Sequence, residues 1–166
     1  DIAASEFARL AYGDHPYASD GKGTVESVSA LTRDDIVAAH RAVFARDRLF
    51  VSAVGDITPQ ALGTLLDTLF ADLPATGAAL PGPAEVQIGG GETVIGFDIP
   101  QSVVVFGQRG IDRDDDDFFA AYVMNQILGA GGFETRLMTE VREKRGLTYG
   151  VYSYLAPRDL AAVYMG

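Results

Sequence analysis

The stretch Val141–Pro157, VREKRGLTYGVYSYLAP, joins a basic helix end to a segment with three tyrosines. A helical period over residues 134–145 predicts one apolar face, which is formed by Leu137, Met138 and Val141. Gly146 ends this predicted helix, because glycine readily adopts the left-handed conformation found at helix C-termini. The residues after Gly146 are predicted to form a strand. An arginine and a tyrosine, Arg145 and Tyr149, therefore lie on either side of a sharp junction.

Arg145 and Tyr149 are the candidate functional residues of this junction. Arg145 falls within about 35° of the centre of the apolar helix face, at about 100° per residue. In the predicted strand, Tyr149 shares a face with Leu147 and Val151 and can approach Arg145. A guanidinium and a phenol suit peptide carbonyl groups, which offer only acceptors. The structural alternative is an arginine that caps the helix C-terminus beside a core tyrosine, and the residues alone leave both interpretations open.

The rest of the chain mixes helices and strands without a regular alternation. Helical spacing and cap residues predict helices at residues 2–12, after Thr32, after Thr58-Pro59 and at about 114–128. Short apolar runs predict strands at residues 49–55, 92–99, 101–108 and 160–166. This order of elements favours an α+β fold over a doubly wound parallel sheet.

The composition changes between residues 75 and 91, where ATGAALPGPAEVQIGGG is rich in glycine, alanine and proline. Such a composition predicts a linker. The linker would separate residues 1–74, the end of a first α+β domain, from residues 92–166, the truncated start of a second. The chain begins like the middle of an amphipathic helix and ends like a strand cut before its turn. We therefore expect an excerpt from a longer protein.

Charge and composition narrow the classes of partner. The formal net charge of −10 over 166 residues argues against nucleic acid and anionic membrane. The sequence contains no cysteine, which excludes disulfides and thiolate metal sites. No apolar run approaches the roughly 20 residues of a membrane span. These features fit a bacterial cytoplasm and a periplasm equally well, so they leave the location open.

Several motifs have simpler structural interpretations than functional ones. The acidic run Asp112–Asp117 lacks the glycine and glutamate of a calcium loop and suits a helix N-terminus. A glycine-rich loop, formed by Gly129, Gly131 and Gly132, follows a helix and precedes no lysine. It is therefore predicted to be a helix stop and tight turn rather than a phosphate site.

The two histidines, His15 and His40, have no neighbouring histidine at helical spacing. Zinc needs three or four well-spaced ligands, so the sequence predicts no metal site in this segment. His40 is predicted to pack within an apolar helix stripe, and His15 to make a structural contact in its loop. No self-sufficient active site is predicted.

Two long stretches resemble the pitrilysin/insulinase family of zinc metallopeptidases, which includes the mitochondrial-processing type. These are ILGAGGFETRLMTEVREKRGLTYGVYSYL at 127–155 and HPYASDGKGTVESVSALTRDDIVAAHRAVFARDRLFVSAVGDIT at 15–58. The first is similar to the family pattern of a glycine-rich loop, Ser-Arg-Leu and then Arg-Glu-Lys-x-Gly-Leu-x-Tyr. It departs from that pattern at Glu134-Thr135, where the family prefers Ser-Ser.

The resemblance implies two incomplete domains of similar α+β fold, with mostly antiparallel sheets packed by helices. It also implies a zinc site built by an inverted His-x-x-Glu-His helix and a distant glutamate, with the motif glutamate as base. This chain lacks that motif, which would lie before residue 1 or in a partner subunit of a homo- or heterodimer. Arg145 and Tyr149 match the family pair that holds the peptide substrate. A non-catalytic partner or scaffold homologue is the alternative, so whether the parent is an enzyme stays open.

Overall fold

The computed structural model describes residues 2–166, and these divide into two compact units. The sheet unit comprises the described residues up to Gly21 together with Pro81–Gly166, and the helical unit comprises Lys22–Leu80. The fold class is α+β, as the sequence predicts. Within residues 2–166, no helix has the length and apolar character needed to span a bilayer. The proposed boundaries of a first domain, a linker and a second domain stay a prediction.

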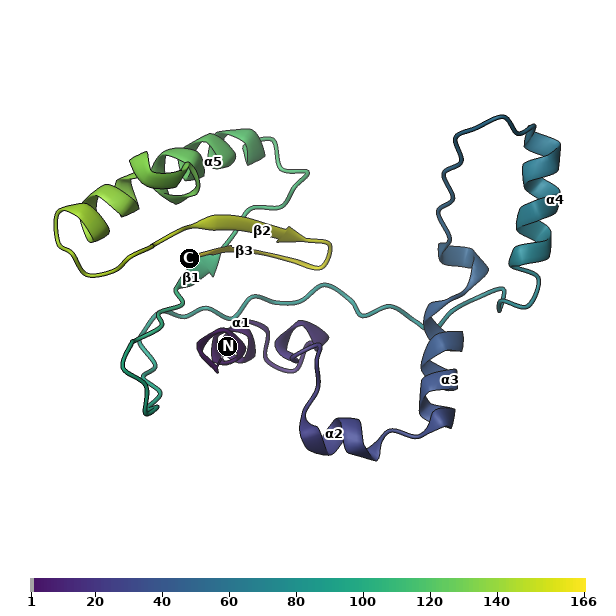
Figure 1. Ribbon diagram of the computed structural model, residues 1–166, viewed down its shortest axis with the longest axis horizontal. Helices are drawn as coiled ribbons and strands as arrows, with labels where there is room; N and C mark the ends of the chain where they lie inside the picture. The colour runs from purple at the N-terminus through teal and green to yellow at the C-terminus, as the bar shows by residue number, and fades with distance from the viewer. Residues whose placement is uncertain (1) are drawn as a thin grey trace. The chain divides into compact units, whose positions relative to one another are not determined.

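A small antiparallel sheet organises the sheet unit (Figure 1). Its strands are β1 (Gly107–Arg109), β2 (Tyr154–Arg158) and β3 (Ala161–Met165), in the order β1-β3-β2. β2 and β3 form a hairpin in which Arg158 pairs with Ala161. β3 is the predicted C-terminal strand, and it is central because both of its edges are paired.

Helix α1 (Ile2–Tyr12) supplies the core on one face of this sheet. Ala11 and Tyr12 are buried with Ala161 and Val163 of β3. The extended segment after Pro81 joins them, because the Gln87 amide donates to the Ala11 carbonyl at 2.8 Å. The short helix η1 (Pro16–Ala18) follows α1. Alternation along β3 then places Tyr164 on the opposite face.

Helix α5 (Phe118–Asn125) covers that opposite face and leads into irregular helical turns (Figure 1). The turns are η3 (Gln126–Ala130), η4 (Gly132–Glu134) and η5 (Met138–Glu143). η3 and η5 are π-helical, with one more residue per hydrogen-bonded ring than an α-helix. The predicted helix at 114–128 begins later, at Phe118. The predicted α-helix at 134–145 is replaced in large part by the π-helix η5.

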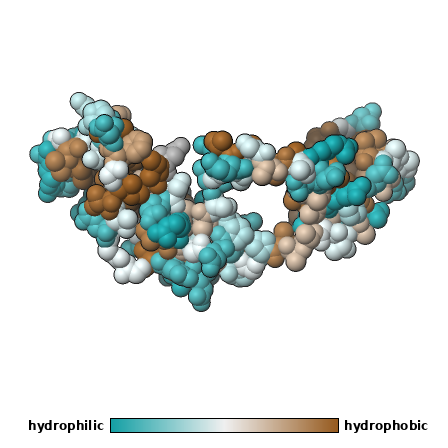
Figure 2. Space-filling model, turned by 90° about the horizontal axis from the view of Figure 1, so that it is seen from below, coloured by the Kyte–Doolittle hydropathy of each residue, from teal (hydrophilic) through white to brown (hydrophobic). Residues whose placement is uncertain are grey.

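The helical unit contains α2 (Val25–Ala30), α3 (Arg33–Val43), η2 (Arg46–Arg48) and α4 (Pro59–Leu69). Each α-helix begins where the sequence supplies a threonine cap, and the side chains of Thr24, Thr32 and Thr58 each accept a backbone N–H of the first turn. Ala45 is the one buried residue among the described residues of this unit. Its helices leave large apolar side chains at the surface, including those of Ile36, Phe44 and Leu69. Figure 2 shows such apolar side chains as brown atoms at the surface.

Most of the predicted strands are wrong. Residues 49–55 and 92–99 form no ladder, and the predicted strand at 101–108 is reduced to β1. Residues 147–153 are also not a strand, so the inference that Tyr149 shares a strand face with Leu147 and Val151 fails. The physical reason is the same in each case. An extended segment becomes a strand only when a neighbour accepts its backbone hydrogen bonds. Within residues 2–166, β3 does so for the end of 101–108, and no strand does so for 49–55, 92–99 or 147–153.

Candidate functional site

Tyr149 lies in an open pocket of the sheet unit with a volume of about 710 Å³. Two segments that are distant in the sequence line it: Gln101 and Ser102 on one side, and Arg142 with residues 146–149 on the other. Tyr149 is 90% exposed, which is unusual for so large an aromatic residue. An exposed phenol beside polar side chains is typical of a binding surface rather than of a core.

The turn after η5 brings Tyr149 to this position. Gly146 has φ of 63°, and its amide donates to the Arg142 carbonyl at 2.9 Å. The Leu147 amide reaches back to the Val141 carbonyl at 3.1 Å, which completes a helix-terminating motif. The Thr148 hydroxyl then accepts the Gly150 amide at 3.2 Å. These bonds turn the chain sharply and leave Tyr149 at the outside of the bend.

Arg145 lies in the turn after η5 and makes its polar contacts with Glu140 of that helix. Its Nη1 donates to the Glu140 carbonyl and, at 3.0 Å, to Glu140 Oε2. Its side chain is 56% exposed and lies in the turn after η5, so the predicted position near the centre of an apolar α-helical face is not observed. Arg145 is also not among the residues that line the Tyr149 pocket. Its role in holding a substrate stays a prediction.

Glu140 is the acceptor for two basic side chains. Hydrogen bonds from Lys144 and then from Arg145 lower the pKa of the Glu140 carboxyl below its ordinary value. The Lys144 ammonium lies 2.5 Å from Glu140 Oε1, an i,i+4 pair on the solvent side. Such exposed pairs contribute little to stability, so Arg145 is held only weakly by Glu140.

Arg142 is the residue that the sequence reasoning missed. It lines the same pocket as Tyr149, and its guanidinium packs over the Phe133 ring with its carbon 4.8 Å from the ring centroid. A wheel drawn at about 100° per residue assumes an α-helix. η5 is π-helical, and the Lys144 amide donates to the Thr139 carbonyl five residues back. The wider turn changes which basic residue faces the pocket.

The glycine-rich loop connects α5 to η5. A Cβ at Gly129 would overlap Ser153, and a Cβ at Gly131 would lie 2.7 Å from the Gln126 carbonyl oxygen. Gly132 has φ of 87°, in the region that favours glycine. Close packing and a left-handed turn thus account for the three glycines.

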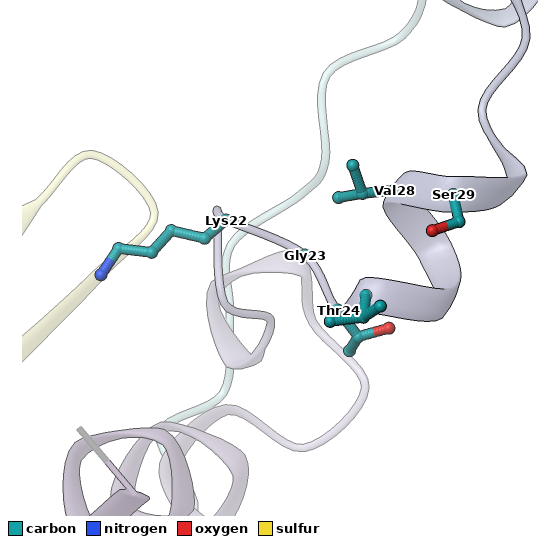
Figure 3. Close-up of a pocket in the computed structure, with 6 residues that line it drawn as sticks. Lys22, Gly23, Thr24, Val28 and Ser29 are labelled. Atoms are coloured by element: carbon teal, nitrogen blue, oxygen red, sulfur yellow. The ribbon is translucent and has the colours of Figure 1, made fainter.

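A second pocket, of about 370 Å³, lies in the helical unit and is shown in Figure 3. It is lined by residues at the beginning of α2, including Gly23, Thr24 and Val28. Figure 3 shows the Lys22 side chain extending away from that helix. Thr24 and Ser27 already cap each other's backbone amides, so the helix end has no need of a ligand. We assign no function to this pocket.

The histidines make local contacts. His15 Nδ1 accepts the Tyr17 amide at 3.2 Å, and Nε2 lies 3.0 Å from the Gly82 carbonyl, which is the structural contact expected for it. His40 contacts the Phe44 ring at 4.8 Å but is exposed, so the prediction that it packs in an apolar stripe is wrong. Within residues 2–166, no three histidine, aspartate or glutamate side chains converge as a metal site would require. The side chains of the described residues therefore do not offer a ligand set that fits zinc.

Sequence comparison decides the family. A sequence model described as Peptidase M16 inactive domain matches residues 30–165. This chain belongs to that family. It is 35% identical to an uncharacterized zinc protease of Streptomyces coelicolor, over all of this chain and 38% of the relative. It is 33% identical to an uncharacterized zinc protease of Mycobacterium leprae, over 93% of this chain and 36% of the relative.

Solved structures agree with the M16 assignment. The crystal structure of a peptidase M16 inactive domain from Pseudomonas fluorescens is 38% identical with a TM-score of 0.79, and the match covers 99% of this chain and 40% of that one. A protease from Helicobacter pylori is 23% identical with a TM-score of 0.76, which shows the fold alone. The chain therefore spans about two fifths of the length of the proteins that it matches.

Proposed function

We propose that this chain is a non-catalytic, peptide-binding part of a zinc metallopeptidase of the M16 type. The observation that carries the proposal is the pocket where the exposed Tyr149 meets Arg142, Gln101 and Ser102. Phenol, guanidinium, amide and hydroxyl groups can all donate hydrogen bonds. A peptide backbone presents a row of carbonyl acceptors, which such a surface can hold in register.

Zinc and the catalytic base would come from outside this chain. Relatives in this family are named zinc proteases, whereas the histidines and carboxylates of residues 2–166 do not gather into a ligand set. In the parent protein, zinc would activate water for peptide hydrolysis. The zinc-bearing domain would be part of the same polypeptide or of a partner subunit, in a homo- or heterodimer. This chain would bind the peptide and pair with that domain.

Hydrogen bonds to the peptide would come from Tyr149 and from two arginines, Arg142 and Arg145. Tyr149 donates its hydroxyl, and Arg142 lies in the same pocket with its guanidinium packed over Phe133. Arg145 follows on the next turn, held by Glu140. Because Arg145 can be released from an exposed ion pair at small cost, it can contact a peptide that extends beyond the pocket.

The test uses the full-length protein with any partner subunit, and compares Tyr149→Phe, Arg142→Ala and Arg145→Ala. Each substitution that removes a substrate donor should lower kcat/KM by about 5-fold to 150-fold, which corresponds to about 1–3 kcal/mol. Zinc content should stay unchanged. Lysine should restore little at either arginine position, since an ammonium cannot reproduce the planar fork.

Arg136→Ala is the matched control, because Arg136 is exposed in the same region and does not line the pocket. It should leave kcat/KM unchanged. The helix-capping alternative makes the opposite forecast: a lower melting temperature, nearly normal turnover and good restoration by lysine. That pattern at Arg142 and Arg145, together with nearly normal turnover in Tyr149→Phe, would refute the peptide-binding role.

A non-catalytic homologue is the second candidate, favoured by the description of the matching family as an inactive domain. Such a protein would serve as an inactive partner subunit or a scaffold. Its pocket variants would then weaken assembly with the partner while leaving peptide hydrolysis by that partner intact. Sedimentation of the purified variants separates this outcome from the first.

A further inference from the structure

A buried chain of hydrogen bonds lies behind the loop that carries Tyr149. Ser153 is 2% exposed and Asn125 is 3% exposed, which is rare for polar residues. The Ser153 hydroxyl donates to Asn125 Oδ1 at 2.8 Å, and the Tyr164 hydroxyl donates to Ser153 Oγ at 2.9 Å. Ser153 therefore uses its one donor and an acceptor site at once.

The same serine also holds the glycine-rich loop through its backbone. The Ser153 amide donates to the Gly129 carbonyl at 3.3 Å. Gly129 is buried so closely against Ser153 that any side chain would overlap the hydroxyl. Ser153 thus connects α5, the glycine-rich loop and β3, the elements that surround the start of the hairpin. Among the described residues, no fully buried side-chain polar atom lacks a hydrogen-bond partner.

The segment from Leu147 to Tyr152 depends on anchors at its two ends. It forms no ladder with the sheet, and its only side-chain hydrogen bonds in the described structure join Thr148 to Gly150. One anchor is the helix-terminating turn at Gly146, and the other is Ser153. A segment held only at its ends moves when either anchor loosens.

We propose that Asn125, Ser153 and Tyr164 form a positioning network that fixes the segment 147–152 and, through it, places Tyr149 in the peptide pocket. None of the three residues lines that pocket. They are positioning residues, since they act through the backbone of the segment. The consequence for peptide binding rests on the proposed function, whereas the fixing of the segment does not.

The test compares Ser153→Ala and Tyr164→Phe with the unmodified full-length protein. Tyr164→Phe keeps the ring and removes only the hydroxyl that donates to Ser153. Amide exchange and KM can therefore still be measured in this variant if Ser153→Ala folds poorly. In both variants, amide hydrogen exchange in residues 147–152 should become faster. KM for a peptide substrate should rise about twofold to tenfold while kcat changes less, as the loss of one hydrogen bond would give. The double variant should show less than the sum of the two effects, because both break one network.

Val163→Ala is the matched control. Val163 is the neighbour of Tyr164 on β3, is 1% exposed and faces the α1 side of the sheet. It should lower the melting temperature without selectively speeding exchange in residues 147–152 or changing KM. Exchange in 147–152 that rises no more in Ser153→Ala and Tyr164→Phe than in Val163→Ala would overturn the network.

Two further results separate this inference from the proposed function. If Tyr149→Phe leaves kcat/KM unchanged, the peptide site is wrong, and the exchange measurement alone then decides whether the network holds the segment. If Tyr149→Phe raises KM while exchange quickens in Ser153→Ala and Tyr164→Phe with KM unchanged, the segment does not position Tyr149 and the inference is overturned.

Discussion

Gly146 ends η5 in the left-handed region, with φ of 63°, and no atom lies within 4 Å of where its Cβ would stand. Backbone conformation alone therefore requires glycine at this position. Gly63 is the opposite case, since it lies inside α4 with ordinary helical backbone and the same open surroundings. Because neither site is crowded, the two glycines isolate the effect of backbone conformation.

The same substitution at these two sites should have opposite effects. Gly146→Ala should lower the free energy of unfolding by about 1–2 kcal/mol, because a Cβ is disfavoured in the left-handed conformation. Gly63→Ala should raise it by about 0.5–1 kcal/mol, because alanine loses less backbone entropy in a helix. Urea unfolding followed by circular dichroism measures both. Equal shifts of one sign would contradict the assigned backbone conformations.

At the candidate site, the sequence singles out Tyr149 and overlooks Arg142, and the binding roles of Tyr149 and Arg145 stay predictions. Tyr149 could be predicted because Gly146 marks a sharp turn, which is a local feature. Arg142 could not, because a π-helical turn arises from the packing of η5 against its surroundings and leaves no period in the sequence. The Ser153 network was equally invisible, since its three members are separated in the sequence by 28 and 11 residues.

Among the elements, helices were predicted better than strands. α1, α3 and α4 begin and end close to the residues that periodicity and caps indicate, because helical hydrogen bonds join residues near in sequence. Strand ladders join distant residues, and a run of apolar residues does not reveal whether a partner exists. The C-terminal strand β3 succeeded because the preceding β2 supplies a hairpin partner at once.

The cap of α3 offers a test at the scale of one helix. The Thr32 hydroxyl accepts the Asp35 amide at 3.2 Å, and Asp35 Oδ2 accepts the Thr32 amide at 2.9 Å. Thr32→Ala should lower the free energy of unfolding of the helical unit by about 1 kcal/mol, since an orphan helix donor loses its partner. Thr68→Ala in α4 is the control, because its hydroxyl bonds a helical carbonyl and caps nothing. A change no larger at Thr32 than at Thr68 would contradict the capping role.

For the whole molecule, apolar exposure is the dominant feature. Side chains such as Phe50, Val54, Phe97 and Phe119 are more than half exposed. Soluble proteins rarely leave so many large apolar groups uncovered. The proteins that this chain matches are more than twice its length, so their remaining parts are candidates to cover these surfaces.

We expect residues 1–166 alone to bind an apolar fluorescent dye and to self-associate. The measurement is dye fluorescence together with light scattering over a range of protein concentrations. Full-length protein at the same molar concentration is the control, and it should bind less dye. A monomer that leaves the dye dark at every concentration would rule out uncovered apolar faces.

Pro157 affects which edge of the sheet another chain can pair with during that self-association. Arg158 and Ala161 flank the two-residue turn of the β2–β3 hairpin. Along β2, the backbone N–H and C=O groups of successive residues therefore point alternately toward β3 and toward the open edge of the sheet. Pro157 falls on the outward side, where a proline has no N–H to donate. Another chain that tried to extend the sheet beyond β2 would meet a missing donor in the middle of the strand. Growth of the sheet into fibrils is therefore blocked on this side, and the edge of β1 is the one that a solubilising substitution should target.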